Sequence, residues 1–141
     1  MVRILASIVA GTLAAFAVIW LVEFAGHAAW PVASDLDLRD PEAAARALPA
    51  IPLAAKLVVV LAWFAGSLAG GAVAKRITGS WWAAWPVAGF VALAGIMTVL
   101  MMPHPVWMQL AAVAAPLLGG LAASHIVGPA RTRRGERDAD L

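Results

Sequence analysis

The chain has 141 residues, of which 63% are hydrophobic and only 13% are charged, and its mean hydropathy is +0.88. A soluble domain is closer to half apolar and about a quarter charged, so this chain has too few charges to cover a water-facing surface. The absence of cysteine excludes disulfides and thiolate metal sites. The composition therefore excludes an ordinary soluble domain and predicts an all-α membrane protein.

Four apolar runs follow one another along the chain, at about residues 4–25, 53–73, 82–102 and 106–127. Each is close to the ~20 residues that cross a bilayer as a helix, and none shows the alternation of a membrane β-strand. We therefore expect a four-helix transmembrane domain over residues 1–130, an outer loop over 26–52, and a basic tail over 131–141. The first run is longer than the apolar core of a signal peptide, which favours an uncleaved anchor helix.

Basic residues predict the orientation of the chain. Arg3 precedes the first run, Lys75 and Arg76 lie between the second and third, and Arg131, Arg133, Arg134 and Arg137 follow the fourth. By the positive-inside rule these residues face the cytoplasm, so both termini are expected there. We call this end of the bundle the inner end. A basic cluster of Lys75, Arg76, Arg131, Arg133 and Arg134 is expected to face anionic lipid headgroups, which excludes nucleic acid as the partner.

Two alignments suggest an internal repeat. An offset of 49 residues places Gly70 on Gly119 and Gly71 on Gly120, and an offset of 77 places His27 on His104 and Trp30 on Trp107. The two halves of the chain therefore predict a tandem helix-hairpin repeat, with a pseudo-two-fold axis along the membrane normal.

Small residues recur every four positions in the second and fourth runs. Lipid gives helices no hydrophobic reason to associate, so close packing between small residues must hold them together. We expect these stripes to pack the second span against the fourth within one chain, in preference to forming a dimer. The packing glycines are Gly66, Gly70, Gly71, Gly119 and Gly120. Pro116 is expected to kink the fourth span.

Polar side chains gather at the predicted outer boundary, and this layer is the candidate site: Glu23, His27, Lys56, His104 and Gln109. Two imidazoles and a carboxylate can bind a transition metal, and two imidazoles at one depth can bind haem b. The favoured interpretation needs no cofactor, with Glu23 paired to Lys56 and the His–Trp pairs anchored at the headgroups. Whether any metal binds stays open. The centre of the membrane holds only hydroxyls, which argues against a proton pump or a transporter of charged substrates.

The outer loop contains a helix-start signal. Asp40 can cap a short helix with Pro41 at its first position and Glu42 in its first turn, and Pro49 would end it. The spacing of Asp35, Asp37 and Asp40 also hints at calcium, but the glycine and the final glutamate of a calcium-binding loop are missing. The capped surface helix is the favoured interpretation.

Four motifs carry a resemblance: E-x-x-x-H-x-x-W-P from Glu23, D-x-R-D-P-E from Asp37, A-W-x-x-G-x-x-x-G-G from Ala62, and P-H-P-x-W from Pro103. This pattern resembles small four-helix proteins of the bacterial inner membrane whose activity is uncharacterised. The resemblance implies a location in the bacterial inner membrane and a topology of four spans. It implies no activity.

The sequence thus predicts a non-enzymatic membrane protein without catalytic residues, which acts as a homo-oligomer or as an accessory subunit of a membrane complex. The alternative is a small-solute or lipid transporter or channel that uses the outer Glu/His layer. A haem- or metal-binding membrane protein is the third class.

Overall fold

The computed structural model describes residues 1–31, 40–101 and 104–126, and within these ranges it is helical without strands. The helices follow one another in the order α1 (Val2–Ala29), α2 (Pro41–Ala47), η1 (Leu48–Ala50), α3 (Leu53–Thr78), η2 (Trp81–Ala83), α4 (Ala84–Met101) and α5 (Val106–Ile126). Helical segments over residues 2–29, 53–78, 81–101 and 106–126 are long and apolar enough to cross a membrane. The predicted all-α fold with four candidate spans is therefore confirmed.

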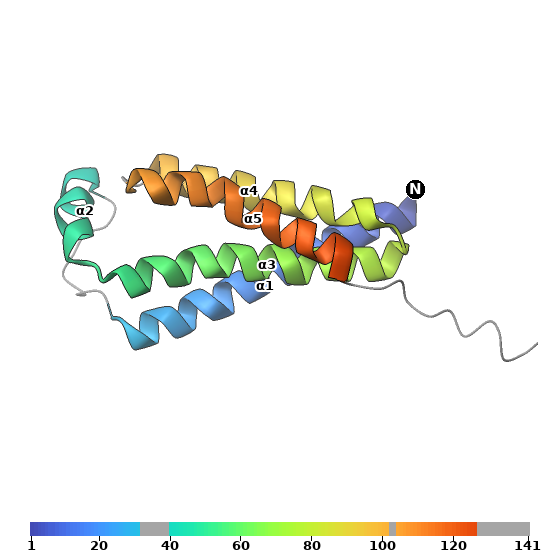
Figure 1. The fold of residues 1–141 in the computed structure, drawn as a ribbon, viewed down its shortest axis with the longest axis horizontal. Coiled ribbons are helices and arrows are strands. Elements are labelled where there is room, and N and C mark those ends of the chain that lie inside the picture. Colours follow the sequence, from blue (N-terminus) through green and yellow to red (C-terminus); the bar gives the residue numbers. More distant parts are fainter. Residues whose placement is uncertain (32–39, 102–103, 127–141) are drawn as a thin grey trace, which may run out of the picture.

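The long helices form two antiparallel hairpins, α1–α3 and α4–α5. Both α3 and α4 contact every other long helix, whereas α1 and α5 lie at opposite corners without touching among the described residues. Figure 1 shows the hairpins close together at the end that carries the N-terminus and separated at the other end, where α2 lies. We call that second end the outer end. The C-terminal end of α5 lies at the inner end, with the N-terminus.

Close approach between helices depends on small residues. The largest side chains with almost no exposure are only valines, a proline and serines: Val87, Val91, Pro116, Ser7 and Ser67. A methyl group added at Gly70 would meet the carbonyl oxygen of Gly11 and would lie 2.7 Å from Ala15 Cβ. Since lipid supplies no hydrophobic drive, this backbone proximity supplies the dispersion contacts that hold the bundle together.

All five predicted packing glycines lie at contacts within the chain, but the assignment of their partners was partly wrong. A Cβ added at Gly66 or Gly70 would meet α1, not the fourth span. Gly71 faces Ala123, and Gly119 lies against the backbone of α3 at Phe64. Adjacent helical residues point about 100° apart, so the central helix α3 presents the Gly66–Gly70 stripe to α1 and its neighbouring residues to α5.

Pro116 lies inside α5 and is buried there, and the kink expected at this residue stays a prediction. Proline has no N–H, so the carbonyl of Ala112, four residues earlier, loses its donor within the helix. Gly95 of α4 packs against that carbonyl, and a Cβ at Gly95 would lie 2.9 Å from Ala112 O. A glycine at this point lets α4 approach close enough for its Cα hydrogens to face the exposed oxygen.

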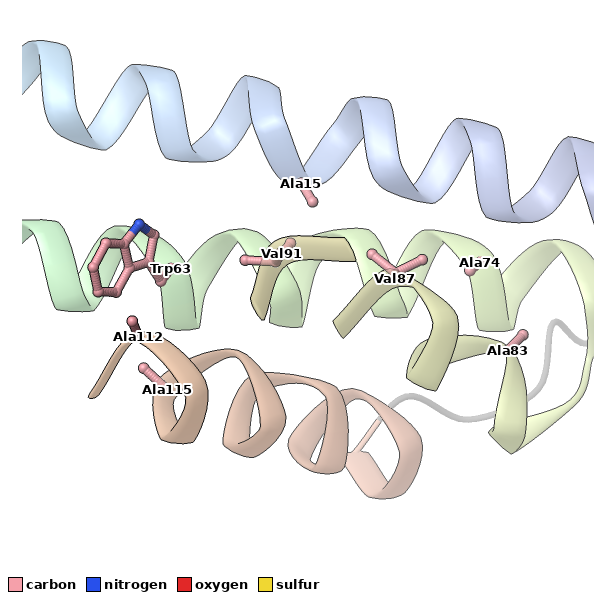
Figure 2. Packing of buried hydrophobic residues seen from close by; sticks show 8 residues of the cluster. All are labelled: Ala15, Trp63, Ala74, Ala83, Val87, Val91, Ala112 and Ala115. Atoms are coloured by element: carbon pink, nitrogen blue, oxygen red, sulfur yellow. The ribbon is translucent and has the colours of Figure 1, made fainter. Parts of the chain in front are cut away.

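Trp63 marks the level at which the bundle opens. Its side chain is 4% exposed, and Figure 2 shows it beside Ala112 and Ala115 of α5, whereas alanines and valines fill the rest of the cluster. On the outer side of this level, α3 has no buried residue before Ala62, and α1 has none after Ala15. Trp63 therefore lies close to the outer limit of burial on α3, whereas α5 has a buried residue farther out, Met108.

The short helix α2 begins as the sequence predicts. The Glu42 N–H donates to the Asp40 carboxylate at 3.0 Å, which satisfies one of the donors left free at a helix start. The helix ends at Ala47, and Pro49 lies in the short 3₁₀ turn that follows. Asp35 and Asp37, the other residues of the calcium interpretation, lie outside the described residues.

Candidate functional site

The predicted outer-face polar layer is divided between the two hairpins. Glu23 and His27 lie on α1 and Lys56 in the first turns of α3, whereas His104 and Gln109 belong to the α4–α5 hairpin. Figure 1 shows the outer ends of the two hairpins well apart. Among the described residues, no three His, Asp or Glu side chains come together as a group that could hold a metal ion.

Glu23 and His27 do meet, through a bond to the backbone. The His27 Nδ1 lies 2.7 Å from the Glu23 carbonyl oxygen, and because a carbonyl only accepts, the ring must donate through Nδ1–H. This contact spans one helical turn and fixes the orientation of the exposed imidazole. The acceptor is the backbone carbonyl of Glu23, so the Glu23 carboxylate takes no part in this hydrogen bond.

The expected ion pair between Glu23 and Lys56 is wrong: within the part of the chain that the structure describes, no Lys56 nitrogen lies within 4.0 Å of the Glu23 carboxylate. The packing register explains why. A Cβ at Gly26 would lie 2.7 Å from Val58 Cγ1, so these positions face each other across the α1–α3 hairpin. Lys56 therefore lies roughly 8 Å farther out along the helix axis than Glu23, at 1.5 Å per residue.

Gln109 closes the turn between α4 and α5. Its side-chain amide donates to the His104 carbonyl oxygen at 2.9 Å, and its backbone N–H donates to the Pro105 carbonyl at 3.2 Å. These bonds tie the start of α5 to the preceding turn. These hydrogen bonds give Gln109 a structural role in the turn.

The inner end holds an arrangement that the sequence did not reveal. Arg3 of α1 donates through Nε to the Ile77 carbonyl at the end of α3, at 2.8 Å. Lys75 of α3 donates through Nζ to the Ser124 carbonyl near the end of α5, at 2.6 Å. The last carbonyls of a helix lack partners within it and carry partial negative charge. Each of these two helix ends is therefore capped by a cation from a neighbouring helix.

The expectation that Lys75 faces lipid is wrong, because its side chain is only 7% exposed. The long alkyl chain is buried among the small residues of α3 and α5, and the ammonium reaches the carbonyl of Ser124. Arg76 is exposed, and its contact with anionic headgroups stays a prediction. The remaining members of the predicted basic cluster, Arg131, Arg133 and Arg134, lie outside the described residues.

One sequence signal points to these contacts. The offset of 49 residues that aligns the second and fourth runs pairs Ser67 with Pro116 and Lys75 with Ser124. The structure joins those same pairs: Ser67 Oγ donates to the Pro116 carbonyl at 2.7 Å, and Lys75 Nζ donates to the Ser124 carbonyl. Since α3 and α5 run in the same direction, aligned positions lie at the same depth and can touch.

The hydroxyls at membrane depth serve backbone contacts. Ser7, Thr98 and Ser124 donate to carbonyls three or four residues earlier in their own helices, and Ser67 donates across to α5. Thr12 Oγ1 is buried without a hydrogen-bond partner among the described residues. The hydrogen-bonded hydroxyls stabilise helices and helix contacts, whereas Thr12 adds no such bond.

Two hollows open at the outer end. The larger, about 670 Å³, lies between the end of α1, the short helix α2 and the start of α3, and Arg46 is the single charged side chain among its described lining residues. The smaller, about 330 Å³, follows the seam between α1 and α3, and its described lining residues are apolar. Trp30 belongs to both linings.

Comparisons with known protein families, with curated proteins and with solved structures found no match to this chain.

Proposed function

We propose that this chain is a small, non-enzymatic protein of the bacterial inner membrane that acts by assembly, as a homo-oligomer or as an accessory subunit of a membrane complex. The observation that carries the proposal is the exposed aromatic face of α1, formed by Phe16, Trp20 and Phe24. These residues recur every four positions, so they lie on one side of the helix.

The aromatic face belongs to the least enclosed span. Only 22% of the membrane-depth segment of α1 is buried, against 33 to 39% for the other three spans. Trp20 is 67% exposed and Phe24 60%, and their rings stack with centroids 5.5 Å apart. Rigid stacked aromatics offer large contact area at little entropic cost, which suits a protein–protein contact.

The depth of Trp20 adds to this argument. It lies seven residues before His27, which corresponds to about 10 Å inward from the outer boundary at 1.5 Å per residue. Tryptophans that face lipid are enriched at the headgroup level, where the indole N–H meets polar groups. No hydrogen bond from Trp20 occurs among the described residues. A second membrane protein seated on this face would bury the ring and could accept that bond.

We expect the protein purified from its native host in mild detergent to run as an oligomer or with co-purifying membrane chains. The double variant Trp20→Leu/Phe24→Leu is expected to lower the association constant of the assembly about tenfold, since aromatic side chains carry much of an interface's binding energy. Mass photometry or light scattering measures the change. Phe90→Leu is the matched control, because Phe90 is also half exposed on its span. The proposal is contradicted if the wild-type protein stays monomeric at every tested concentration and no other membrane chain co-purifies with it.

The proposed orientation, with both termini in the cytoplasm, is supported by the charges at the inner end. Because the chain has no cysteine, a single introduced thiol reports its own location. In spheroplasts, a membrane-impermeant maleimide is expected to label Glu42→Cys on α2 at once and His125→Cys on α5 only after permeabilisation. Both positions are exposed, so burial does not bias the comparison. The reverse labelling pattern would overturn the orientation.

A tandem hairpin duplication remains part of the proposal and is supported by the 49-residue offset of the two α3–α5 hydrogen bonds. The symmetry is inexact, since α3 contacts α4 whereas, among the described residues, α1 does not contact α5. The transporter or channel alternative has less geometric support, because the outer polar layer on which it relied is divided between the hairpins. Binding of a transition metal or haem b has less support for the same reason, because its candidate ligands lie on different hairpins.

A further inference from the structure

The two hollows at the outer end adjoin at Trp30, and we treat them as the two parts of one candidate site. Trp30, at the end of α1, belongs to both linings, so the headgroup-level hollow beneath α2 meets the apolar seam between α1 and α3. Figure 1 shows α2 at the outer end of the bundle. The site therefore passes from the depth of the outer loop to the depth of the hydrocarbon.

The seam has the length and chemistry of an acyl-chain groove. It runs along α1 from Trp30 inward to Leu21, and Val58 and Leu61 form its opposite wall on α3. The nine steps from Leu21 to Trp30 cover about 14 Å at 1.5 Å per residue, which is close to the ~15 Å depth of one leaflet's hydrocarbon. Its described lining residues are apolar apart from the indole N–H of Trp30, so the groove matches a hydrocarbon chain.

The upper hollow supplies the complementary charge. Arg46, in the last turn of α2, is the single charged residue among the described lining residues, and the other side chains there are apolar. A guanidinium presents a planar set of donors that matches phosphate geometry. One cation at headgroup level above a chain-length apolar groove fits an amphiphile with one anionic head.

We propose that this site binds a glycerophospholipid from the outer leaflet, with its phosphate on Arg46 and one acyl chain in the α1–α3 seam. The site is separate from the aromatic face of α1 and does not depend on assembly, but its assignment to the outer leaflet rests on the proposed orientation. It also lies at the opposite end of the bundle from Arg3, Lys75 and Arg76. Binding would tie α2 to the hairpin, because α2 contacts none of the long helices directly among the described residues.

Native mass spectrometry of the detergent-purified protein tests the proposal with phosphatidylglycerol as the probe. We expect one phosphatidylglycerol to remain bound at activation energies that strip further lipids, and diacylglycerol with the same chains to be lost. Arg46→Gln is expected to weaken the tightest binding about tenfold, in line with the loss of a hydrogen bond to a charged group. Arg76→Gln, an equal charge change at the inner end, is expected to leave it unchanged.

A second pair of variants tests the groove. Ala25→Phe places a ring in the seam and is expected to reduce the retained lipid as strongly as Arg46→Gln does. Ala17→Phe makes the same change at an exposed α1 position outside the lining and should have no effect. Unchanged melting temperatures show that the variants fold. The proposal is overturned if Arg46→Gln and Ala25→Phe retain phosphatidylglycerol like the wild type, or if diacylglycerol is held equally well.

Discussion

Replacing Gly70 with alanine is expected to lower the free energy of unfolding by about 2–3 kcal/mol, near the upper end for overpacked cores. The new methyl group would meet the Gly11 carbonyl oxygen and would lie 2.7 Å from Ala15 Cβ and 2.9 Å from Val87 Cγ1. A helix backbone cannot move away as a flexible side chain can. Helices α1, α3 and α4 would therefore have to separate at their closest point.

Unfolding by titration with SDS, followed by circular dichroism, measures this effect. Gly89→Ala is the control, because Gly89 is also a helical glycine and a Cβ there meets nothing within 4 Å. That substitution should be neutral or stabilising by up to about 1 kcal/mol, since alanine favours the helix. Equal destabilisation by both substitutions would show that close backbone approach at Gly70 does not hold the bundle together.

Replacing Lys75 with methionine is expected to cost about 2 kcal/mol, the range for a hydrogen bond to a charged group. Methionine keeps most of the buried volume but removes the ammonium that lies 2.6 Å from the Ser124 carbonyl. The end of α5 then loses its cap and the favourable charge at its negative pole. Hydrogen exchange should rise in the last turn of α5, with less change in α3.

Arg76→Met is the matched control for this prediction. Arg76 is the next residue along α3, carries the same charge and is exposed. Its substitution should change the free energy of unfolding by less than about 0.5 kcal/mol, as is usual for surface positions. If both variants lose the same stability, net charge at the inner end matters and the bond from Lys75 to Ser124 does not.

The polar residues illustrate how far sequence reasoning reaches at the site. The motif that begins at Glu23 correctly places a carboxylate and an imidazole one turn apart on a helix, because helical periodicity fixes that spacing. It could not show that His27 bonds to the backbone, since side-chain and backbone acceptors are both within reach. It also could not show that Lys56 is out of register with Glu23, because register is set where Gly26 meets Val58 across the hairpin.

Lys75 shows the same limit at the other end of the bundle. Sequence rules for loop charges treat Lys75 and Arg76 alike, since both follow an apolar run. On a helix, adjacent residues point about 100° apart, so only one of them can face α5. The 49-residue alignment contained the information that Lys75 and Ser124 share a depth. The contact became evident only when α3 and α5 were placed side by side.

The sequence by itself determined that this is an all-α chain with four segments of membrane-spanning length, because hydrophobicity and run length are local properties read against the thickness of a bilayer. It also determined which residues are small enough to pack helices and where α2 begins. Only the tertiary structure decided which helices are in contact. It also decided that the two hairpins are close together at the inner end and separated on the outer side of Trp63, and that cations cap the ends of neighbouring helices. Those features depend on rotation and register between helices, which in lipid are set by side-chain packing and not by an apolar stripe.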